Sequence, residues 1–183
     1  MTARDTIRLA AVGDLHYTRT SQGACQPLFA QAAEQADVLL LCGDLTDLGI
    51  AEEAHILAKD LTSTVKIPVI AVLGNHDYQS DAPGDVARIL TEAGVRVLDG
   101  DTCEVHGVAF AGVKGFAGGF DRGALQPWGE SVIKQFVREG VDEALKLESA
   151  LAKLRASLRI VLLHYAPIRA TVLGEPEEIL PFL

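Results

Sequence analysis

The stretch Val69-Ile70-Ala71-Val72-Leu73-Gly74-Asn75-His76-Asp77 decides how this chain is organised. Its first five residues are apolar, and a short run of that kind is typical of a strand covered on both faces. An amide, an imidazole and a carboxylate then follow directly, in Asn75, His76 and Asp77. These groups offer a neutral oxygen ligand, a proton donor and an acceptor. The segment therefore predicts a buried strand that ends in a functional loop.

Other apolar runs of strand length also end in polar loops; they span residues 7–12, 37–42 and 158–163. The polar residues that follow the four strands are Asp14 and His16, Asp44, Asn75 and His76, and His164. An Asp after Gly is usually a turn residue, and a lone His after a strand is usually only hydrogen-bonded. Ligands of open α/β sheets, however, bind beyond the carboxyl ends of the strands. Four such ends in one fold therefore predict one shared site.

Helices are predicted over residues 24–36 and 51–62, between the first three strands. Alternation of strand and helix implies right-handed parallel crossovers and hence an α/β fold. A further helix is predicted over 83–93, followed by short strands at 95–98, 103–105 and 108–113. The turns Asp99-Gly100 and His106-Gly107 predict antiparallel pairing of these strands, so the sheets are expected to be mixed.

The last part of the chain has a glycine-rich stretch over residues 115–129 and a helical pattern over 131–156. Long loops are often functional, so residues 115–129 are either a mobile lid over the site or an ordinary connection. Tyr17, Tyr78 and Tyr165 each lie next to a polar residue of the predicted site. They are candidates for the wall of a substrate pocket.

Length and composition indicate one globular domain, because the chain has 183 residues of which 49% are hydrophobic. The formal net charge of −9 argues against general nucleic-acid binding. The three widely spaced cysteines fit free thiols in a reducing compartment. Residues 1–5 lack an apolar signal-peptide core, and no apolar run is long enough to span a membrane. We therefore expect a cytoplasmic protein without a membrane partner.

The residue types after the strands are typical of a metal centre. Carboxylate, imidazole and amide oxygen without thiolate suit Mn, Fe, Zn or Mg. A carboxylate can bridge two cations about 3.5–4 Å apart, and such a pair activates water and clamps a phosphoryl group. The sequence therefore predicts metal-assisted hydrolysis of a phosphoester.

The order of the motifs resembles the calcineurin-like metallophosphoesterase family. The motifs are D-x-H at Asp14 and His16, G-D-x-x-D from Gly43 to Asp47, G-N-H-D from Gly74 to Asp77, and the later His164. The resemblance implies a four-layer α/β/β/α sandwich with mixed sheets and a two-metal site between them. It also implies a metal-bridging hydroxide as the nucleophile and a small phosphoester as the substrate.

The resemblance assigns roles residue by residue. Asp14 and His16 would hold the first metal, Asp44 would bridge both, and Asn75 and His164 would hold the second. His76 would protonate the leaving oxygen or stabilise the transition state, and Asp77 would orient its ring. For Asp47 the choice stays open between a place around the metal ligands and a cap on the following helix.

The chain departs from the family at one motif, the terminal G-H-x-H, because it contains no Gly-His pair. Two of its five histidines, His55 in a predicted surface helix and His106 in a predicted turn, are expected to be structural or solvated. The chain also ends in the apolar run 179–183. We therefore expect residues 1–183 to be a single domain truncated at its C-terminus. Its metal ions would then be incompletely bound. Self-association into a homo-oligomer would cover the apolar surface that the truncation exposes.

Three functions follow from these observations. The leading prediction is metal-dependent hydrolysis of a phosphomonoester or phosphodiester. The alternative is a non-catalytic binding or scaffold protein that keeps the phosphoesterase fold with an impaired metal site. The third is a regulatory module that senses divalent cations. A scaffold has no reason to keep His76 and Asp77 together, and their presence favours the enzyme.

Overall fold

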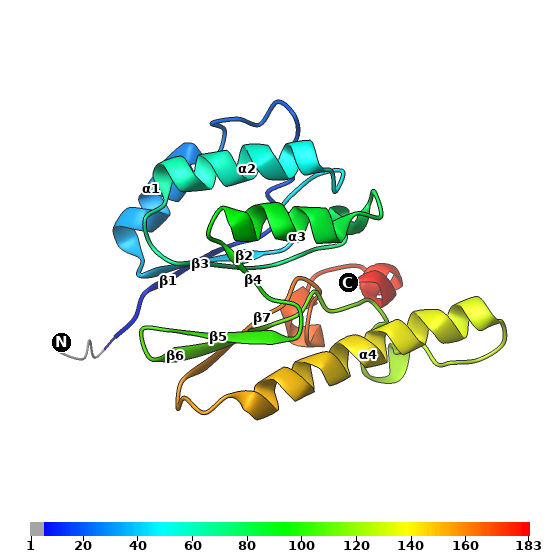
Figure 1. The fold of residues 1–183 in the computed structure, drawn as a ribbon. Coiled ribbons are helices and arrows are strands. Elements are labelled where there is room, and N and C mark those ends of the chain that lie inside the picture. The colour runs from blue at the N-terminus through cyan, green and yellow to red at the C-terminus, as the bar shows by residue number, and fades with distance from the viewer. Residues whose placement is uncertain (1–5) are drawn as a thin grey trace.

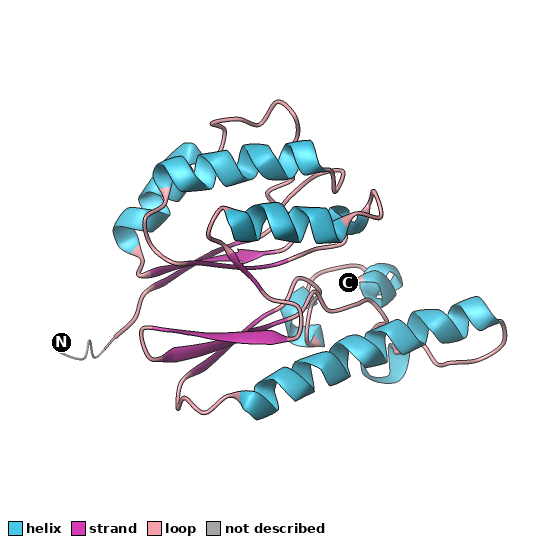
Figure 2. Cartoon of the chain, in the orientation of Figure 1, coloured by secondary structure: helices cyan, strands magenta, loops and turns pink. Residues whose placement is uncertain are grey.

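The computed structural model describes residues 6–183, which form four layers (Figure 1). Three helices cover the first sheet, a second sheet lies against its other face, and one long helix covers the second sheet (Figures 1 and 2). The predicted α/β/β/α sandwich is thus confirmed. The expectation that residues 1–5 carry no signal-peptide core lies outside the described residues.

The first sheet is entirely parallel and has the strand order β1-β2-β3-β4. Its strands are β1 (Leu9–Val12), β2 (Val38–Cys42), β3 (Val69–Val72) and β4 (Arg96–Val97). The connecting helices are α1 (Gln26–Gln35), α2 (Ala51–Thr64) and α3 (Pro83–Glu92). Parallel strands require such crossovers, and this explains why strands and helices alternate in the first half of the chain.

The second sheet is mixed and has the order β5-β6-β7. Its strands are β5 (Asp101–Val105), β6 (Val108–Gly112) and β7 (Arg159–Leu162); β6 pairs antiparallel with β5 and parallel with β7. The long helix is α4 (Ser131–Lys153), and short 3₁₀ helices are η1 (His76–Tyr78), η2 (Asp121–Gly123), η3 (Arg169–Val172) and η4 (Glu177–Phe182).

One predicted hairpin is correct and one is wrong. The turn at His106-Gly107 joins the antiparallel strands β5 and β6, as expected. The turn at Asp99-Gly100 instead carries the chain from β4 in the first sheet to β5 in the second. The physical reason is that β4 pairs parallel with β3, so the turn changes layer and does not reverse a strand.

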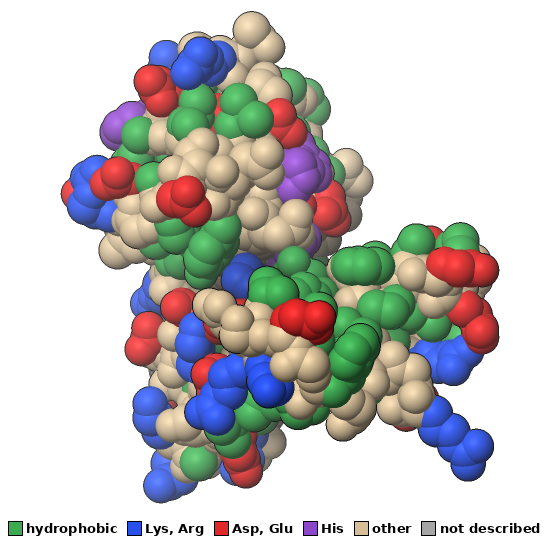
Figure 3. Space-filling model, turned by 90° about the vertical axis from the view of Figure 1, so that its right-hand side faces the viewer, with side chains coloured by type: hydrophobic (Ala, Val, Ile, Leu, Met, Phe, Trp, Pro, Cys, Tyr) green, Lys and Arg blue, Asp and Glu red, His purple; other side chains and the backbone are tan. Residues whose placement is uncertain are grey.

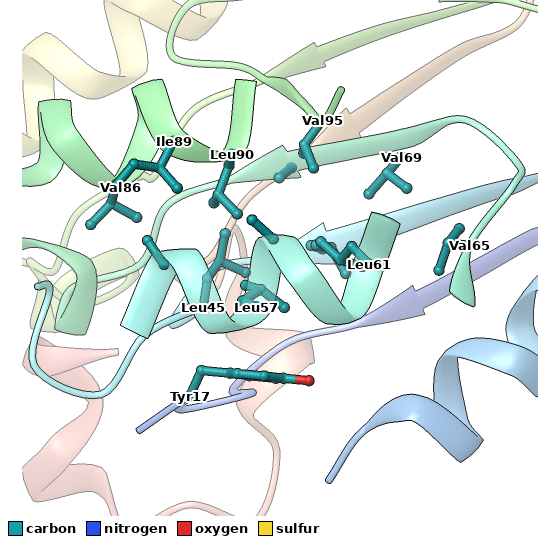
Figure 4. Close-up of a cluster of buried hydrophobic side chains, with 14 of the residues drawn as sticks. Tyr17, Leu45, Leu57, Leu61, Val65, Val69, Val86, Ile89, Leu90 and Val95 are labelled. Carbon is teal, nitrogen blue, oxygen red and sulfur yellow. The ribbon is translucent and has the colours of Figure 1, made fainter. Parts of the chain in front are cut away.

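The alternation of side chains along β2 explains why both faces of this strand are apolar. Leu39 and Leu41 belong to the core beneath the helices, part of which is shown in Figure 4. Val38 and Leu40 belong to the core between the two sheets, together with Phe110 of β6. Successive residues of a strand point to opposite faces, so a strand with neighbours on both sides needs an uninterrupted apolar run.

The outermost core, between β6 and α4, is smaller. It contains Ala109 and Ala111 of β6 and Ala150 and Leu154 at the end of α4. Alanines bury little area, so this layer adds less hydrophobic free energy than the leucine-rich layers do. Within the described residues, none of the helices combines the length and the apolar character needed to span a bilayer.

Candidate metal centre

The loops that follow β1 and β2 lie side by side because their backbones continue to pair beyond the strands. The N–H groups of Asp14 and His16 donate to the carbonyl oxygens of Gly43 and Asp44, at 3.1 and 2.9 Å. The N–H of Tyr17 donates to the carbonyl oxygen of Leu45 at 3.1 Å. These bonds place residues from two motifs, separated in the chain by a helix, at one edge of the first sheet.

Three of the predicted ligands adopt a left-handed backbone conformation. The φ angles are 55° at Asp14, 43° at His16 and 47° at Asp44. Such conformations cost about 1–3 kcal/mol each for residues other than glycine, and they gather at functional sites. The surrounding hydrogen bonds hold these three residues in conformations that free chains avoid.

Two glycines of the motifs are required by close approach. A Cβ on Gly74 would overlap the backbone nitrogen and Oδ1 of Asp44. A Cβ on Gly43, whose φ is 91°, would lie 2.5 Å from Nδ1 of His164. Only glycine lets the backbone pass this close to the ligands. The glycines in G-D and G-N-H-D therefore serve the packing of the site.

The carboxylate of Asp44 lies between two imidazoles. Its Oδ2 is 3.7 Å from Nε2 of His16, and its Oδ1 is 3.4 Å from Nε2 of His164. The backbone N–H of His76 also donates to Oδ1, at 2.9 Å. Asp44 is only 4% exposed. This is the position that the predicted bridging role requires.

The hydrogen bonds of His164 leave one ring nitrogen available as a ligand. Its Nδ1 is 3.1 Å from the carbonyl oxygen of Cys42, and because a carbonyl can only accept, Nδ1 carries the proton. In the neutral ring Nε2 then presents a lone pair toward Oδ1 of Asn75, 2.9 Å away. A cation shared by these two acceptors would satisfy both of them. Neighbouring ligands of a small octahedral cation with bonds of about 2.1 Å are separated by about 3 Å.

Within residues 6–183, possible ligand atoms of His, Cys, Asp and Glu form two groups, and the atoms of each group lie within 4.8 Å of one another. One group consists of Asp14, Asp44 and His164, and the other of His16, Asp47 and His76. The sequence predicted that Asp14 and His16 share one metal, whereas the structure groups Asp14 with the histidine of the second sheet. The donor chemistry in both groups fits a divalent cation.

Asp47 belongs to the site. Its Oδ1 is 3.3 Å from Nδ1 of His16 and 3.9 Å from Nδ1 of His76. The following helix, α2, begins after Ile50 and has no side-chain cap. Of the two roles left open for Asp47, the helix cap is therefore wrong.

The role predicted for Asp77, orienting the ring of His76, is also wrong. Asp77 is fully buried, and its two oxygens accept four hydrogen bonds, from Gly74 N, Leu45 N, Thr46 N and Thr46 Oγ1. A carboxylate has about four acceptor positions, so none is left for the imidazole. The His76 ring is held instead by the carbonyl oxygen of Asp47, 2.8 Å from Nδ1.

The three tyrosines differ in placement. Tyr17 is fully buried beside α2 (Figure 4). Its hydroxyl donates to Asp60 at 2.9 Å, so its predicted place in the pocket wall is wrong. Tyr78 and Tyr165 do line a cavity that begins at Asn75. Burial raises the pKa of both phenols.

Lys114 is a residue of this cavity that the sequence reasoning missed. It follows the apolar run that contains β6 and Val113. A charged residue directly after a buried strand is the sequence signal that could have identified it. The side chain is buried, and burial lowers the pKa of its ammonium group. Its Nζ lies 4.8–5.3 Å from the ring centres of Tyr78, Phe116 and Tyr165.

Some side chains of the glycine-rich segment 115–129 line a cavity, and others are exposed to solvent. Phe116 lines the cavity at Asn75, whereas Trp128 is 64% exposed. A separate cavity of about 470 Å³ lies between this segment and α4, and none of the predicted metal ligands lines it. We place the site at the strand ends, because the ligand atoms converge there. Figure 3 shows this edge, with histidine side chains at the surface above a band of hydrophobic side chains.

Comparison with known proteins identifies a family for this chain. A family model described as calcineurin-like phosphoesterase matches residues 7–183 and so includes every predicted ligand. No curated protein sequence matches the chain.

Proposed function

The chain belongs to the calcineurin-like phosphoesterase family, and from this premise we propose that it hydrolyses a small phosphomonoester or phosphodiester with the help of divalent metal ions. The proposal rests on one observation, the buried Asp44 carboxylate with one oxygen toward His16 and the other toward His164. A carboxylate in this position suits a two-metal centre.

Two cations of the Mn, Fe, Zn or Mg type would be held on either side of Asp44. Asp14, Asn75 and His164 would complete one side, and His16 the other, with Asp47 next to it. When bound, the ions would polarise the phosphoryl oxygens and lower the pKa of water to about 7.

In this proposal His76 supplies a proton to the leaving oxygen. Its backbone N–H is fixed by Asp44 Oδ1, and its Nδ1–H donates to the carbonyl oxygen of Asp47. This leaves Nε2 to hold the proton that the departing oxygen takes. The ring is 35% exposed, so a substrate can reach it.

The strain at the centre favours the enzyme over a binding scaffold. Asp14, His16 and Asp44 are all held at positive φ, and Gly43 and Gly74 are needed for their packing. A scaffold gains nothing from this cost, whereas a metal centre uses the fixed positions of the donor atoms.

The test is hydrolysis of p-nitrophenyl phosphate and bis(p-nitrophenyl) phosphate, with Mn²⁺ and with a chelator. We expect activity only with added metal, and a loss of at least about 100-fold in His76→Ala, as general acids contribute about 10²–10⁴-fold. His55→Ala changes an exposed histidine of α2 and is the matched control. Undiminished turnover in the chelator and in His76→Ala would refute the proposal.

A further inference from the structure

A cavity of about 410 Å³ opens beside the candidate metal centre. Asn75 lines it at the metal end, and its walls include the rings of Tyr78, Phe116, Phe136 and Tyr165. The size is in the range of small-molecule sites. His16 and His76 are not part of its lining. A phosphoester whose leaving oxygen meets His76 would therefore place its other ester group, the one retained on phosphorus, in this cavity.

The cavity contains an ammonium group without a carboxylate partner. Lys114 is 7% exposed, and its Nζ donates to the carbonyl oxygen of Gly115 at 2.7 Å. Within residues 6–183 no carboxylate oxygen lies within ion-pair distance of this nitrogen. The nearby Glu143 is engaged with the N–H of Gly115 and with Lys146. Glu139, an exposed residue of α4, supplies the carboxylate of the lining and, like Glu143, acts on Lys114 without an ion pair. The Nζ of Lys114 is therefore open to direct contact with an anionic group of a ligand.

Lys114 is also fixed relative to the metal centre. Its carbonyl oxygen accepts the backbone N–H groups of His164 and Tyr165, each at 3.1 Å. The strand end that presents His164 therefore also sets the position of Lys114. One of these two hydrogen bonds links the backbone of Lys114 directly to that of a predicted metal ligand, His164.

The rings and the cation together define the chemistry of the ligand. Aromatic rings pack favourably against another ring, in offset or edge-to-face geometry. A cage of aromatic rings can also bind a quaternary ammonium group. Here, however, the ammonium group of Lys114 already lies over the faces of Tyr78, Phe116 and Tyr165. A second cation would be repelled. The cavity thus selects a flat aromatic group and rejects a choline-like one.

This inference rests on the proposed function. We propose that the substrate is a phosphodiester whose retained ester group is planar and aromatic. That group binds in the cavity of Tyr78, Phe116, Phe136 and Tyr165, and Lys114 contacts the negative charge of the phosphoryl group. Lys114 is the residue that excludes cationic ester groups. In the reaction, water oxygen adds to phosphorus, the bond to the other ester oxygen breaks, and that oxygen leaves with a proton.

The test compares three p-nitrophenyl diesters, in which the second ester group is phenyl, ethyl or choline. With Mn²⁺ we expect kcat/KM for the phenyl diester to exceed that for the ethyl diester at least about 10-fold, and the choline diester to be the poorest substrate. In Lys114→Met we expect the phenyl-to-choline ratio to fall at least about 10-fold. Lys153→Met, an exposed lysine of α4, is the matched control and should keep the wild-type ratio.

A second variant protects the test against misfolding of Lys114→Met. Phe136→Leu removes a half-buried ring whose centre is 4.9 Å from that of Phe116, and it leaves the charge in place. We expect it to slow the phenyl diester more than the ethyl diester. Equal rates for phenyl and ethyl diesters, or an unchanged phenyl-to-choline ratio in folded Lys114→Met, would overturn the inference.

Failure of the proposed function has a different signature, namely no hydrolysis of any diester by the metal-loaded protein. The cavity is then tested by calorimetry with phenylphosphonate and methylphosphonate. Tighter binding of phenylphosphonate, weakened in Lys114→Met, supports the aromatic pocket, and equal binding of the two phosphonates overturns it.

Discussion

The two sheets of this molecule contribute different parts of the site. The first sheet is covered on both faces, and its loops supply all but one of the predicted ligands. The second sheet ends at β7, where Val161 is 37% exposed, and it supplies His164 and Lys114. In the proposed function, the better-buried sheet thus supplies most of the metal ligands, and the more exposed sheet would complete the centre and contact the substrate.

The difference lies in how each loop is restrained. The loops of the first sheet are bonded to one another through the backbone and through Asp44 and Asp77. His164 reaches across from the second sheet and is held by its hydrogen bond to the carbonyl oxygen of Cys42, with Oδ1 of Asn75 2.9 Å from its Nε2. We therefore expect changes in the first sheet's loops to alter the whole centre, and changes in the second sheet to alter one side of it.

Asp44→Asn should have the largest effect. The variant keeps the shape of the side chain but removes the charge that both sides share, so we expect kcat/KM to fall at least about 1,000-fold, which corresponds to about 4 kcal/mol. Steady-state hydrolysis of bis(p-nitrophenyl) phosphate at saturating Mn²⁺ measures this. The exposed Asp101→Asn is the control. A decrease of less than 10-fold would show that Asp44 does not bridge.

Asp77→Ala should be the most destabilising change in the first sheet's loops. It leaves the buried N–H groups of Leu45, Thr46 and Gly74 without their acceptor. Each such group costs about 1–3 kcal/mol, so we expect the free energy of unfolding to fall by at least about 3 kcal/mol. Urea unfolding measures it, with Asp101→Ala as reference. Normal stability with lost activity would restore a catalytic role to Asp77.

His164→Ala tests the second sheet. The variant removes one predicted ligand and leaves the first sheet's hydrogen bonds in place, so we expect Mn²⁺ affinity on one side to weaken about 100-fold while the other side keeps its affinity. Calorimetric titration with Mn²⁺ distinguishes the two sides, and His106→Ala serves as control because His106 is exposed in a turn. Equal weakening on both sides would contradict the division between the sheets.

Tyr17→Phe should have the smallest effect. It removes one hydrogen bond to Asp60, which also accepts from Gly23 and Gln26, so we expect a loss of about 1 kcal/mol with unchanged activity. Burial and the bond to Asp60 raise the pKa of the Tyr17 phenol above its usual 10. The folded state therefore favours the protonated phenol, and its contribution is fully present below about pH 10 and is lost as pH rises further.

Denaturant unfolding of both proteins from pH 7 to 11 measures this pH dependence. The stability advantage of the wild type over Tyr17→Phe should be constant up to about pH 9 and should decrease above pH 10. An advantage that grows with pH would contradict a buried, protonated phenol.

The sequence by itself determined that the first sheet is parallel and covered on both faces, and at which edge the site forms. Uninterrupted apolar runs such as 38–42 and 69–73 require cover on both faces, and alternating helices require parallel strands. Because parallel strands end at the same edge, Asp14, Asp44 and Asn75 had to lie near one another. These conclusions depend on local periodicity and chain order, which a sequence shows directly.

Only the tertiary structure decided the pairing of groups at the centre. His164 bonds to Cys42 across 122 residues of chain, so its place beside Asp44 depends on how the two sheets pack. Packing likewise turned Asp77 toward backbone donors, Tyr17 into the core and Lys114 into a ring of aromatic side chains. A residue's neighbours in the chain do not fix the direction of its side chain; the space and the donors that distant segments bring to it do.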